Sequence, residues 1–343
     1  MTTATSLDPV AWDDRLPYLA NDVLRLIVMP TEQCNLRCVY CYESFEIGRM
    51  GDDTAQGIRR LLTRRAPGLS RLRLDWFGGE PLLAADRIEE IQEHASALAA
   101  RHGFTLEAEA TTNAVMLDAE RLHRFAARGL RRYQISLDGP PEEHDRKRTG
   151  AGGRATFATI WRNVRTALES DLELEILLRV HVDRDNAASI PRLLAMCRDE
   201  LPWDERIRLF LRPLSRLGGP NDARLRILGA EKDQVLADLR EQARRLGLGA
   251  GYAGPEGVAV CYAAAANAFV VRADGGVSRC TVALDDPRNR IGRLTPEGRL
   301  ELDTMAQEPW LRGLLDGDAR ALTCPLKALR SDTAGASPLR VVA

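Results

Sequence analysis

Three cysteines, Cys34, Cys38 and Cys41, fall within eight consecutive residues of the chain. They follow an apolar run at residues 24–29, which predicts a β-strand that ends at Pro30. A loop this short can gather three thiolates around one centre, which is how proteins hold iron–sulfur clusters. Because a [4Fe–4S] cluster has four irons, three ligands would leave one iron open to bind another molecule.

Two other uses of these cysteines suit the sequence less well. A structural zinc site needs four nitrogen or sulfur ligands, and no second C-x-x-C or H-x3-5-H pair stands nearby. A disulfide framework does not suit a chain of 343 residues with seven cysteines and no secretory signal. The cluster is therefore the hypothesis that the rest of the sequence has to support.

A second motif, Gly78-Gly79-Glu80-Pro81, follows a predicted strand at residues 72–76. The glycines permit close backbone approach to a ligand, and the fixed carboxylate can bind an ammonium group. Alone, the four residues would also suit a tight turn. One βα unit after the cysteine loop, however, the pair of motifs resembles the radical S-adenosylmethionine (radical SAM) superfamily. The resemblance implies that the amino and carboxylate groups of SAM bind the open iron and that the second motif binds the amino group. It includes Tyr40, the aromatic residue before the third cysteine.

Further residues suit a SAM pocket. The segment from Ser136 through Asp138 to Pro140 is similar to an element of the radical SAM branch with C-terminal auxiliary clusters, where the serine faces SAM. Ser136 and Asp138 project on one side of the strand, although Asp138 could also form an Asx-type turn. Asn113 resembles the asparagine of the family's Thr-Asn pair, and hydrogen bonding within its loop would explain it equally. Arg179 lies mid-strand, where a charge needs a partner. That partner would be a SAM or substrate carboxylate, or a neighbouring acidic residue.

The C-terminal cysteines suggest a second site. Residues 274–276 predict a hairpin turn that brings Cys261 and Cys280 together. This resembles the start of the SPASM domain, the auxiliary-cluster module of peptide-modifying radical SAM enzymes, and Cys324 resembles one cysteine of its knuckle. The other knuckle positions fall on Ala321, Arg330 and Ala334, so a full two-cluster domain is excluded. The resemblance implies either one auxiliary [4Fe–4S] cluster, as in the shortened twitch module, or a degenerate site. Sulfatase-maturing enzymes carry an aspartate just after the second auxiliary cysteine, and Thr281 stands at that position here. The residues after 325 are expected to form a poorly ordered tail.

Composition excludes several classes of partner. The net charge is −1 with 28% charged residues, so we expect no nucleic-acid partner. The apolar runs are far shorter than the roughly 18 residues of a membrane span, so we expect no membrane association. Residues 1–23 lack the apolar core of an export signal. We therefore expect a cytoplasmic protein, where reduced thiols persist.

The pattern of elements predicts the fold. Strands are expected at residues 24–29, 72–76, 106–112, 133–137, 172–182 and 207–211, with helices between them. Six such units indicate an α/β fold, a partial (β/α)6 TIM-like barrel followed by a small α+β SPASM/twitch-like domain. We expect an N-terminal extension at 1–23, the barrel at 24–215, a helical linker at 216–250 and the auxiliary-cluster domain at 251–343. The cysteine loop would then lie at the C-terminal strand ends, where such sheets place their chemistry.

The resemblance also implies a reaction. A reduced cluster passes one electron to SAM, and the resulting 5′-deoxyadenosyl radical abstracts hydrogen from an unactivated carbon. Since the usual substrate of the auxiliary module is a peptide, we expect a maturase that forms a crosslink or another oxidised product on a ribosomally made peptide. The expected partners are a precursor peptide, an electron donor of the flavodoxin or ferredoxin type and, because few residues precede the barrel, a separate leader-recognition protein. The alternatives are a twitch-type dehydrogenase or mutase of a small metabolite, and a non-catalytic iron–sulfur redox sensor, which would not need the Gly-Gly-Glu-Pro motif.

Overall fold

A curved sheet organises the protein, whose computed structural model describes residues 10–249 and 259–335. Six neighbouring strands are parallel, and each is joined to the next by a helical connection. In spatial order they are β1 (Val23–Val28), β3 (Arg71–Trp76), β4 (Thr105–Thr112), β5 (Arg132–Ser136), β7 (Glu175–Val182) and β8 (Ile207–Pro213). This order gives the expected α/β fold with a partial (β/α)6 barrel.

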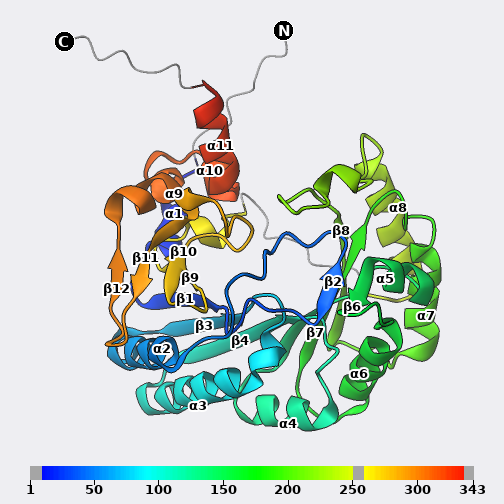
Figure 1. The fold of residues 1–343 in the computed structure, drawn as a ribbon, viewed down its shortest axis with the longest axis horizontal. Helices are drawn as coiled ribbons and strands as arrows, with labels where there is room; N and C mark the ends of the chain where they lie inside the picture. Colours follow the sequence, from blue (N-terminus) through cyan, green and yellow to red (C-terminus); the bar gives the residue numbers. More distant parts are fainter. Residues whose placement is uncertain (1–9, 250–258, 336–343) are drawn as a thin grey trace.

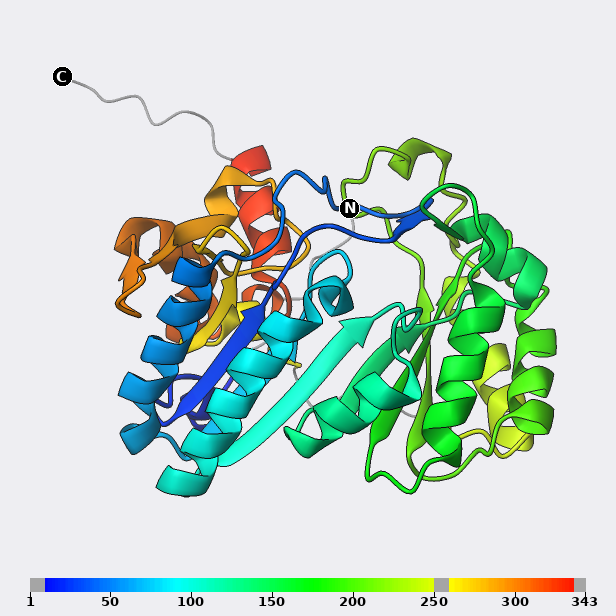
Figure 2. The ribbon, with the colours of Figure 1, turned by 60° about the horizontal axis from the view of Figure 1, so that its bottom comes forward.

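Helices cover the outer side of the curved sheet (Figures 1 and 2). They are α2 (Asp52–Arg65), α3 (Ala85–His102), α4 (Ala119–Ala127), α6 (Phe157–Glu169) and α7 (Ile190–Glu200), with the shorter α5 (Pro141–Lys147) before α6. Two predicted ends are confirmed. Asp118 caps α4 by accepting a hydrogen bond from Arg121 N at 2.8 Å, and Gly103 ends α3 with a φ of +76°.

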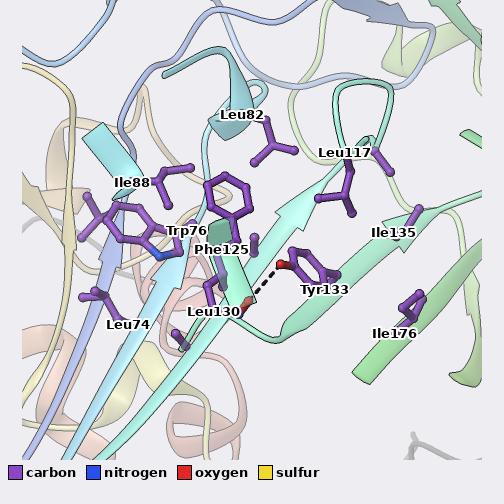
Figure 3. Packing of buried hydrophobic residues seen from close by; sticks show 14 of the residues in the cluster. Leu74, Trp76, Leu82, Ile88, Leu117, Phe125, Leu130, Tyr133, Ile135 and Ile176 are labelled. Carbon is purple, nitrogen blue, oxygen red and sulfur yellow. Dashed lines mark hydrogen bonds between the residues drawn. The ribbon is translucent and has the colours of Figure 1, made fainter. Parts of the chain in front are cut away.

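Alternation along the strands separates an apolar exterior from a polar interior. In β3, Leu72, Leu74 and Trp76 are fully buried against the helices, whereas Arg73 and Asp75 face the inside of the barrel. Figure 3 shows this packing, in which Trp76 and Leu74 lie among side chains from α3 and α4. The interior of the barrel is therefore lined by charged side chains, which shape the site described below.

The C-terminal region continues the same sheet. Here β9 (Ala268–Val271) pairs in parallel with β1, and β10 (Gly276–Ser278) returns antiparallel to β9 through the predicted hairpin. Antiparallel β11 (Arg290–Leu294) and β12 (Leu300–Leu302) complete the ten strands. The helices α9 (Thr304–Asp316), α10 (Ala319–Thr323) and α11 (Pro325–Gly335) lie beside this hairpin (Figure 1).

The prediction of a poorly ordered chain after residue 325 is wrong for its first part, because residues 325–335 form α11. This helix begins with a proline, which suits the first helical turn. The remaining tail residues, 336–343, lie outside the described residues.

The segments that flank the barrel also have partners. The short helix α1 (Trp12–Arg15) reaches the C-terminal region, where Arg15 Nη1 donates to Leu314 O at 2.5 Å. In the expected linker, α8 (Lys232–Arg245) buries Leu236 and Leu239 in the main core. The boundary expected near residue 250 falls outside the described residues. No helix in the described parts of the chain is long and apolar enough to cross a membrane.

Candidate functional site

Backbone pairing fixes the cysteine loop. The strand β2 (Leu36–Cys38) pairs antiparallel with β6 (Arg148–Gly150), so that Cys38 lies opposite Arg148. Val39 N extends the pairing by donating to Lys147 O at 2.9 Å. The chain after α5 therefore holds the loop above the C-terminal ends of the barrel strands.

The three thiols of the loop are partly buried and influence one another. Burial, with a smaller contribution from the charge of Cys38, raises the pKa of Cys34 to about 12 and that of Cys41 to about 11. Burial also raises the pKa of Cys38. Leu36 N donates to Cys34 Sγ at 3.4 Å. Among the described residues, no three His, Cys, Asp or Glu side chains form a group that could hold a single metal ion. A cluster differs in that each thiolate binds a separate iron.

The Gly-Gly turn packs against the chain that leads into the cysteine loop. A Cβ at Gly78 would lie 2.2 Å from Thr31 O, and one at Gly79 would lie 2.5 Å from Gln33 O. Gly78 also has a φ of +117°, which favours glycine. Glu80 N donates to Gln33 O at 2.9 Å. The close approach that the glycines permit is therefore made by the protein's own backbone.

The carboxylate of Glu80 is completely buried and fixed by hydrogen bonds. Oε1 accepts from Leu82 N at 3.0 Å and from Thr112 Oγ1 at 2.7 Å, while Oε2 accepts from Asn113 N at 2.7 Å. Burial raises the pKa of Glu80, and these hydrogen bonds oppose the shift. Pro81 then starts a short 3-10 helix, Pro81–Ala84. The motif thus locks the end of β3 to the end of β4.

Asn113 connects this buried turn to the cysteines. Its Nδ2 donates to Asn35 Oδ1 at 2.7 Å and lies 3.9 Å from Cys34 Sγ, and its Oδ1 accepts from Val115 N at 3.0 Å. Hydrogen bonding within the loop therefore accounts for the position of the Asn113 side chain, in agreement with the second of its two explanations given above. It also orients the residues around the first thiol.

Asp138 supports Tyr40 through a buried network. One carboxylate oxygen accepts from the Tyr40 hydroxyl, and the other lies 3.1 Å from both His181 N and His181 Nδ1. Arg148 Nη1 donates to the Tyr40 hydroxyl at 2.6 Å. Burial would raise the pKa of Asp138, but His181, Arg148 and Tyr40 hold it well below its usual range. Both oxygens are therefore engaged within the protein, and the carboxylate holds Tyr40 in place.

Ser136 and Arg179 are neighbours across β5 and β7 on the inside of the barrel. In the described parts of the chain, the Ser136 hydroxyl makes no hydrogen bond and the buried Arg179 Nε has no partner. Burial lowers the pKa of Arg179, as does the nearby charge of Arg212. Arg179 makes no salt bridge within residues 10–249 and 259–335; the nearby carboxylate of Asp138 opposes the lowering of its pKa but is engaged by Tyr40 and His181. These two side chains could together receive an anion.

The three C-terminal cysteines are brought together from distant segments. Burial raises the pKa of Cys261, and the charges of Cys280 and Cys324 raise it further. Cys261 N donates to Leu322 O at 2.8 Å, which ties it to the helix that precedes Cys324. Thr281, beside Cys280, is engaged with the Tyr262 hydroxyl at 2.8 Å. The geometry therefore offers a second group of three thiols.

A buried cation accompanies these thiols. Arg279 is fully buried and donates to Ala263 O and Ala265 O, in the turn just after Cys261. Burial lowers the pKa of Arg279 to about 10, and the charge of Cys261 opposes that shift. Asn289 Oδ1 accepts from Cys280 N at 2.8 Å and fixes its loop. A positive group beside fixed thiols suits an anionic cluster.

Sequence reasoning missed three charged residues near the loop. Arg272 donates to both carboxylate oxygens of Glu32, at 3.0 and 2.6 Å, and to Leu284 O at 2.9 Å. Burial raises the pKa of Glu43 to about 8, and one of its oxygens is buried without a hydrogen-bond partner among the described residues. The available signal was an arginine at the end of the apolar run 268–271, which requires an acidic partner.

The network predicts a pH effect through His144. This fully buried side chain accepts from Asp138 N at 3.4 Å, and burial lowers its pKa to about 4 from an ordinary value of 6.5. The unfolded chain therefore binds a proton between these pH values and the folded chain does not. The free energy of unfolding should fall by about 2 kcal/mol from pH 7 to pH 5 through this group alone. Urea unfolding of His144→Gln should show a smaller acid loss than the wild type, whereas exposed His123→Gln should match the wild type. Equal losses in the wild type and His144→Gln would contradict this assignment.

The fold and the site together identify the class of protein to which the chain belongs. A partial parallel barrel carries a three-cysteine loop just after its first strand, and a second three-cysteine group lies beside it. The radical SAM superfamily profile matches residues 28–194. A GTP 3′,8-cyclase of Heliobacterium modesticaldum is 31% identical over 295 residues, which is 82% of this chain and 80% of the cyclase. The chain belongs to the radical SAM superfamily, whose members use a [4Fe–4S] cluster and SAM, and it is an enzyme of that superfamily.

Other similarities cover less of the relative or show the fold alone. A serine-type anaerobic sulfatase-maturating enzyme of Klebsiella aerogenes is 29% identical over 180 residues, 50% of this chain but 43% of that enzyme. The solved structure of anSMEcpe with bound AdoMet and the Kp18Cys peptide has a TM-score of 0.63 at 20% identity, over 83% of this chain and 80% of that one. Streptococcus suis SuiB bound to precursor peptide SuiA has a TM-score of 0.61 at 12% identity, over 90% and 73%. The barrel with its C-terminal extension is thus the fold of SPASM-type enzymes.

Proposed function

We propose that this enzyme cleaves SAM reductively and abstracts hydrogen from a peptide, maturing a ribosomally synthesised precursor by an oxidative side-chain modification. The observation that carries the proposal is the cysteine loop held against the Gly-Gly turn, with a second three-cysteine group in the C-terminal region that continues the same sheet. The first group of cysteines would hold the cluster that cleaves SAM. The second would hold an auxiliary cluster for the oxidation of the peptide.

Cys34, Cys38 and Cys41 would hold the SAM-binding cluster. The carbonyl oxygens of Gly78 and Gly79 accept no hydrogen bond within the described residues and would receive the SAM amino group. Glu80, sealed beneath them, would keep the turn in place and add negative charge. This division of roles follows from the saturation of its carboxylate by three hydrogen bonds.

Ser136 and Arg179 would bind the SAM carboxylate, since the orphaned Nε of Arg179 needs an anion. Tyr40, held by Asp138 and Arg148, would line the pocket beside the third cysteine. When bound, the reduced cluster would supply the electron that splits SAM into methionine and a 5′-deoxyadenosyl radical able to abstract hydrogen. The chain itself would orient both ends of SAM.

Several observations support a peptide substrate. The sulfatase-maturating relative acts on a protein by its name, and two enzymes of the same fold were solved with peptides bound. A peptide maturase would also need a flavodoxin or ferredoxin type electron donor. Leader recognition, if the substrate has a leader, would come from a separate protein or from another surface of this chain.

The test of SAM chemistry is anaerobic. Reconstituted protein with SAM and dithionite should release 5′-deoxyadenosine, and a candidate precursor peptide should lose hydrogen in the same mixture. An intact cluster that releases no 5′-deoxyadenosine would refute the proposal. A redox sensor would give that negative result.

A small metabolite is the second candidate substrate. Its support is the GTP 3′,8-cyclase, which matches over 80% of that enzyme's length, while the relatives and solved structures that act on or bind peptides keep this candidate second. Hydrogen loss from a free nucleotide, with no turnover of any peptide encoded nearby, would select it.

Cys261, Cys280 and Cys324 would hold one auxiliary [4Fe–4S] cluster. The triple variant Cys34→Ala, Cys38→Ala, Cys41→Ala should therefore still bind about four irons per chain after anaerobic reconstitution. Adding Cys280→Ala should remove that iron, whereas adding Cys197→Ala, at a buried core cysteine, should not. A triple variant without iron would show that the second site is degenerate.

A further inference from the structure

A cavity of about 490 Å³ occupies the inside of the barrel. Its wall runs from β1 across the sheet to β8, and residues 260–262 face it from the C-terminal region. The charged side chains that line it are mainly basic: Arg25, Arg73, Arg132, Arg206, Arg208 and Arg212, against Glu109 and Glu175. A volume of this size suits a short stretch of peptide or a small ligand.

Most of these charges already have partners. The paired arginines are Arg25 with Asp75 at 2.5 Å, Arg73 with Glu107 at 3.4 Å, Arg132 with Glu175 at 3.5 Å and Arg206 with Asp204 at 2.7 Å. Glu109 faces Arg25, Arg73 and Arg132, whose charges oppose the rise that burial causes in its pKa. Within residues 10–249 and 259–335, Arg208 and Arg212 form no ion pair and no hydrogen bond through their side chains.

The two unpaired arginines share one strand and one face. Arg208 and Arg212 are four residues apart on β8, so both point to the same side, with Cα atoms about 13 Å apart. Across β7 they lie opposite Leu177 and His181. In an extended peptide, side chains at positions i and i+4 have the same spacing. The strand therefore presents a pair of cations matched to an extended chain.

Positive charge is concentrated near Arg212, the second of these two arginines. Arg212 lies close enough to lower the pKa of Arg179, whose Nε has no partner among the described residues. Arg212 is exposed on β8 while the neighbouring Arg179 is half-buried, and two close guanidinium groups repel each other unless an anion accompanies them. SAM is assigned to Arg179, which leaves the anion for Arg208 and Arg212 to come from the substrate.

We propose that Arg208 and Arg212 bind carboxylate side chains of the substrate, which makes the substrate an acidic peptide. This inference rests on the proposed peptide maturase function. The bound segment crosses the cavity along β8 and faces Cys261 and Tyr262 on the opposite wall. Each arginine can make paired hydrogen bonds to a carboxylate, which adds orientation as well as affinity.

The test uses reconstituted holoenzyme with SAM under anaerobic conditions. The probes are a synthetic hexapeptide with glutamate at positions 1 and 5 and serine elsewhere, and the same peptide with glutamine at those positions. Calorimetry should show the glutamate peptide binding at least about tenfold more tightly. Arg208→Gln with Arg212→Gln should remove this preference. The charge-matched control, Arg162→Gln with Arg165→Gln on the outer face of α6, should retain it.

Three results would overturn the proposal. They are equal affinity for the two peptides, a glutamate preference that survives in the β8 variant, and binding of GTP rather than of the glutamate peptide at these arginines. The glutamate and glutamine peptides compare affinities on the unaltered enzyme, so the outcome stands even if a variant folds poorly. Release of 5′-deoxyadenosine by the same preparation separates failure of this inference from failure of the SAM chemistry.

Discussion

Alanine in place of Gly79 is expected to slow SAM cleavage about a hundredfold, because displacing catalytic groups by about 1 Å costs that much. The new Cβ would lie 2.5 Å from Gln33 O and 2.8 Å from Glu32 O. Both atoms are backbone, so neither can swing aside, and the turn must move away from the segment that leads into Cys34. Anaerobic release of 5′-deoxyadenosine and the Kd for SAM would measure the effect.

Gly68 supplies the matched control for this substitution. A Cβ at Gly68 would meet no atom within 4 Å, so Gly68→Ala should cleave SAM at the wild-type rate. Both variants remove the same backbone freedom from one glycine. If Gly79→Ala were as active as Gly68→Ala, the packing of the turn against residues 31–33 would have no role in catalysis.

Arg272→Met is expected to lower the free energy of unfolding by about 3–5 kcal/mol, because it leaves the buried carboxylate of Glu32 without its partner. The side chains of this pair are 10% and 4% exposed, and two hydrogen bonds join them. Urea unfolding followed by fluorescence would measure the loss.

A second substitution distinguishes the unpaired charge from lost packing. Arg272→Met combined with Glu32→Leu should recover most of the stability, since well-packed apolar pairs often replace buried ion pairs without loss. The exposed pair of Arg165 with Glu169 is the reference, and breaking it should cost only about 0.3–0.5 kcal/mol. An Arg272→Met loss as small as that reference would contradict the argument.

The same ion pair links the two groups of cysteines. Glu32 lies two residues before Cys34, and Arg272 also holds Leu284 O, four residues after Cys280. A loss of this pair should therefore disturb both candidate cluster sites, not only the global stability. Iron content of the triple cysteine variant in the Arg272→Met background would report on the second site alone.

Local patterns in the sequence were sufficient to predict the barrel. Alternation in residues 71–76 and the end signals at Gly103 and Asp118 act over a few residues, and the structure has the corresponding strand and helix ends. The pairing of β9 with β1 could not be predicted, because two short apolar runs more than 200 residues apart carry no mark of their register. The helix α11 was not predicted, because the lack of the expected cysteines after Cys324 was taken as a sign of a poorly ordered tail.

The candidate site, like the fold, could be predicted only in part from the sequence. The cysteine spacing and the Gly-Gly-Glu-Pro motif are local and could be found in the chain. The partners of Asp138 could not, because they come from Tyr40 and His181, at opposite ends of the barrel sequence. Choosing between a ligand and an internal partner for a carboxylate requires distances that only the folded chain defines.

The position of β1 between β3 and β9 has a consequence for biosynthesis. The ribosome makes residues 25–28 long before residues 268–271, with which they pair. At about 5–20 residues per second, one edge of the first strand waits roughly ten to fifty seconds for its partner. An apolar strand with an open edge is prone to pair with other chains. Slow translation or a truncated transcript should therefore favour aggregation, and chaperones that cover strand edges should raise the yield of folded enzyme.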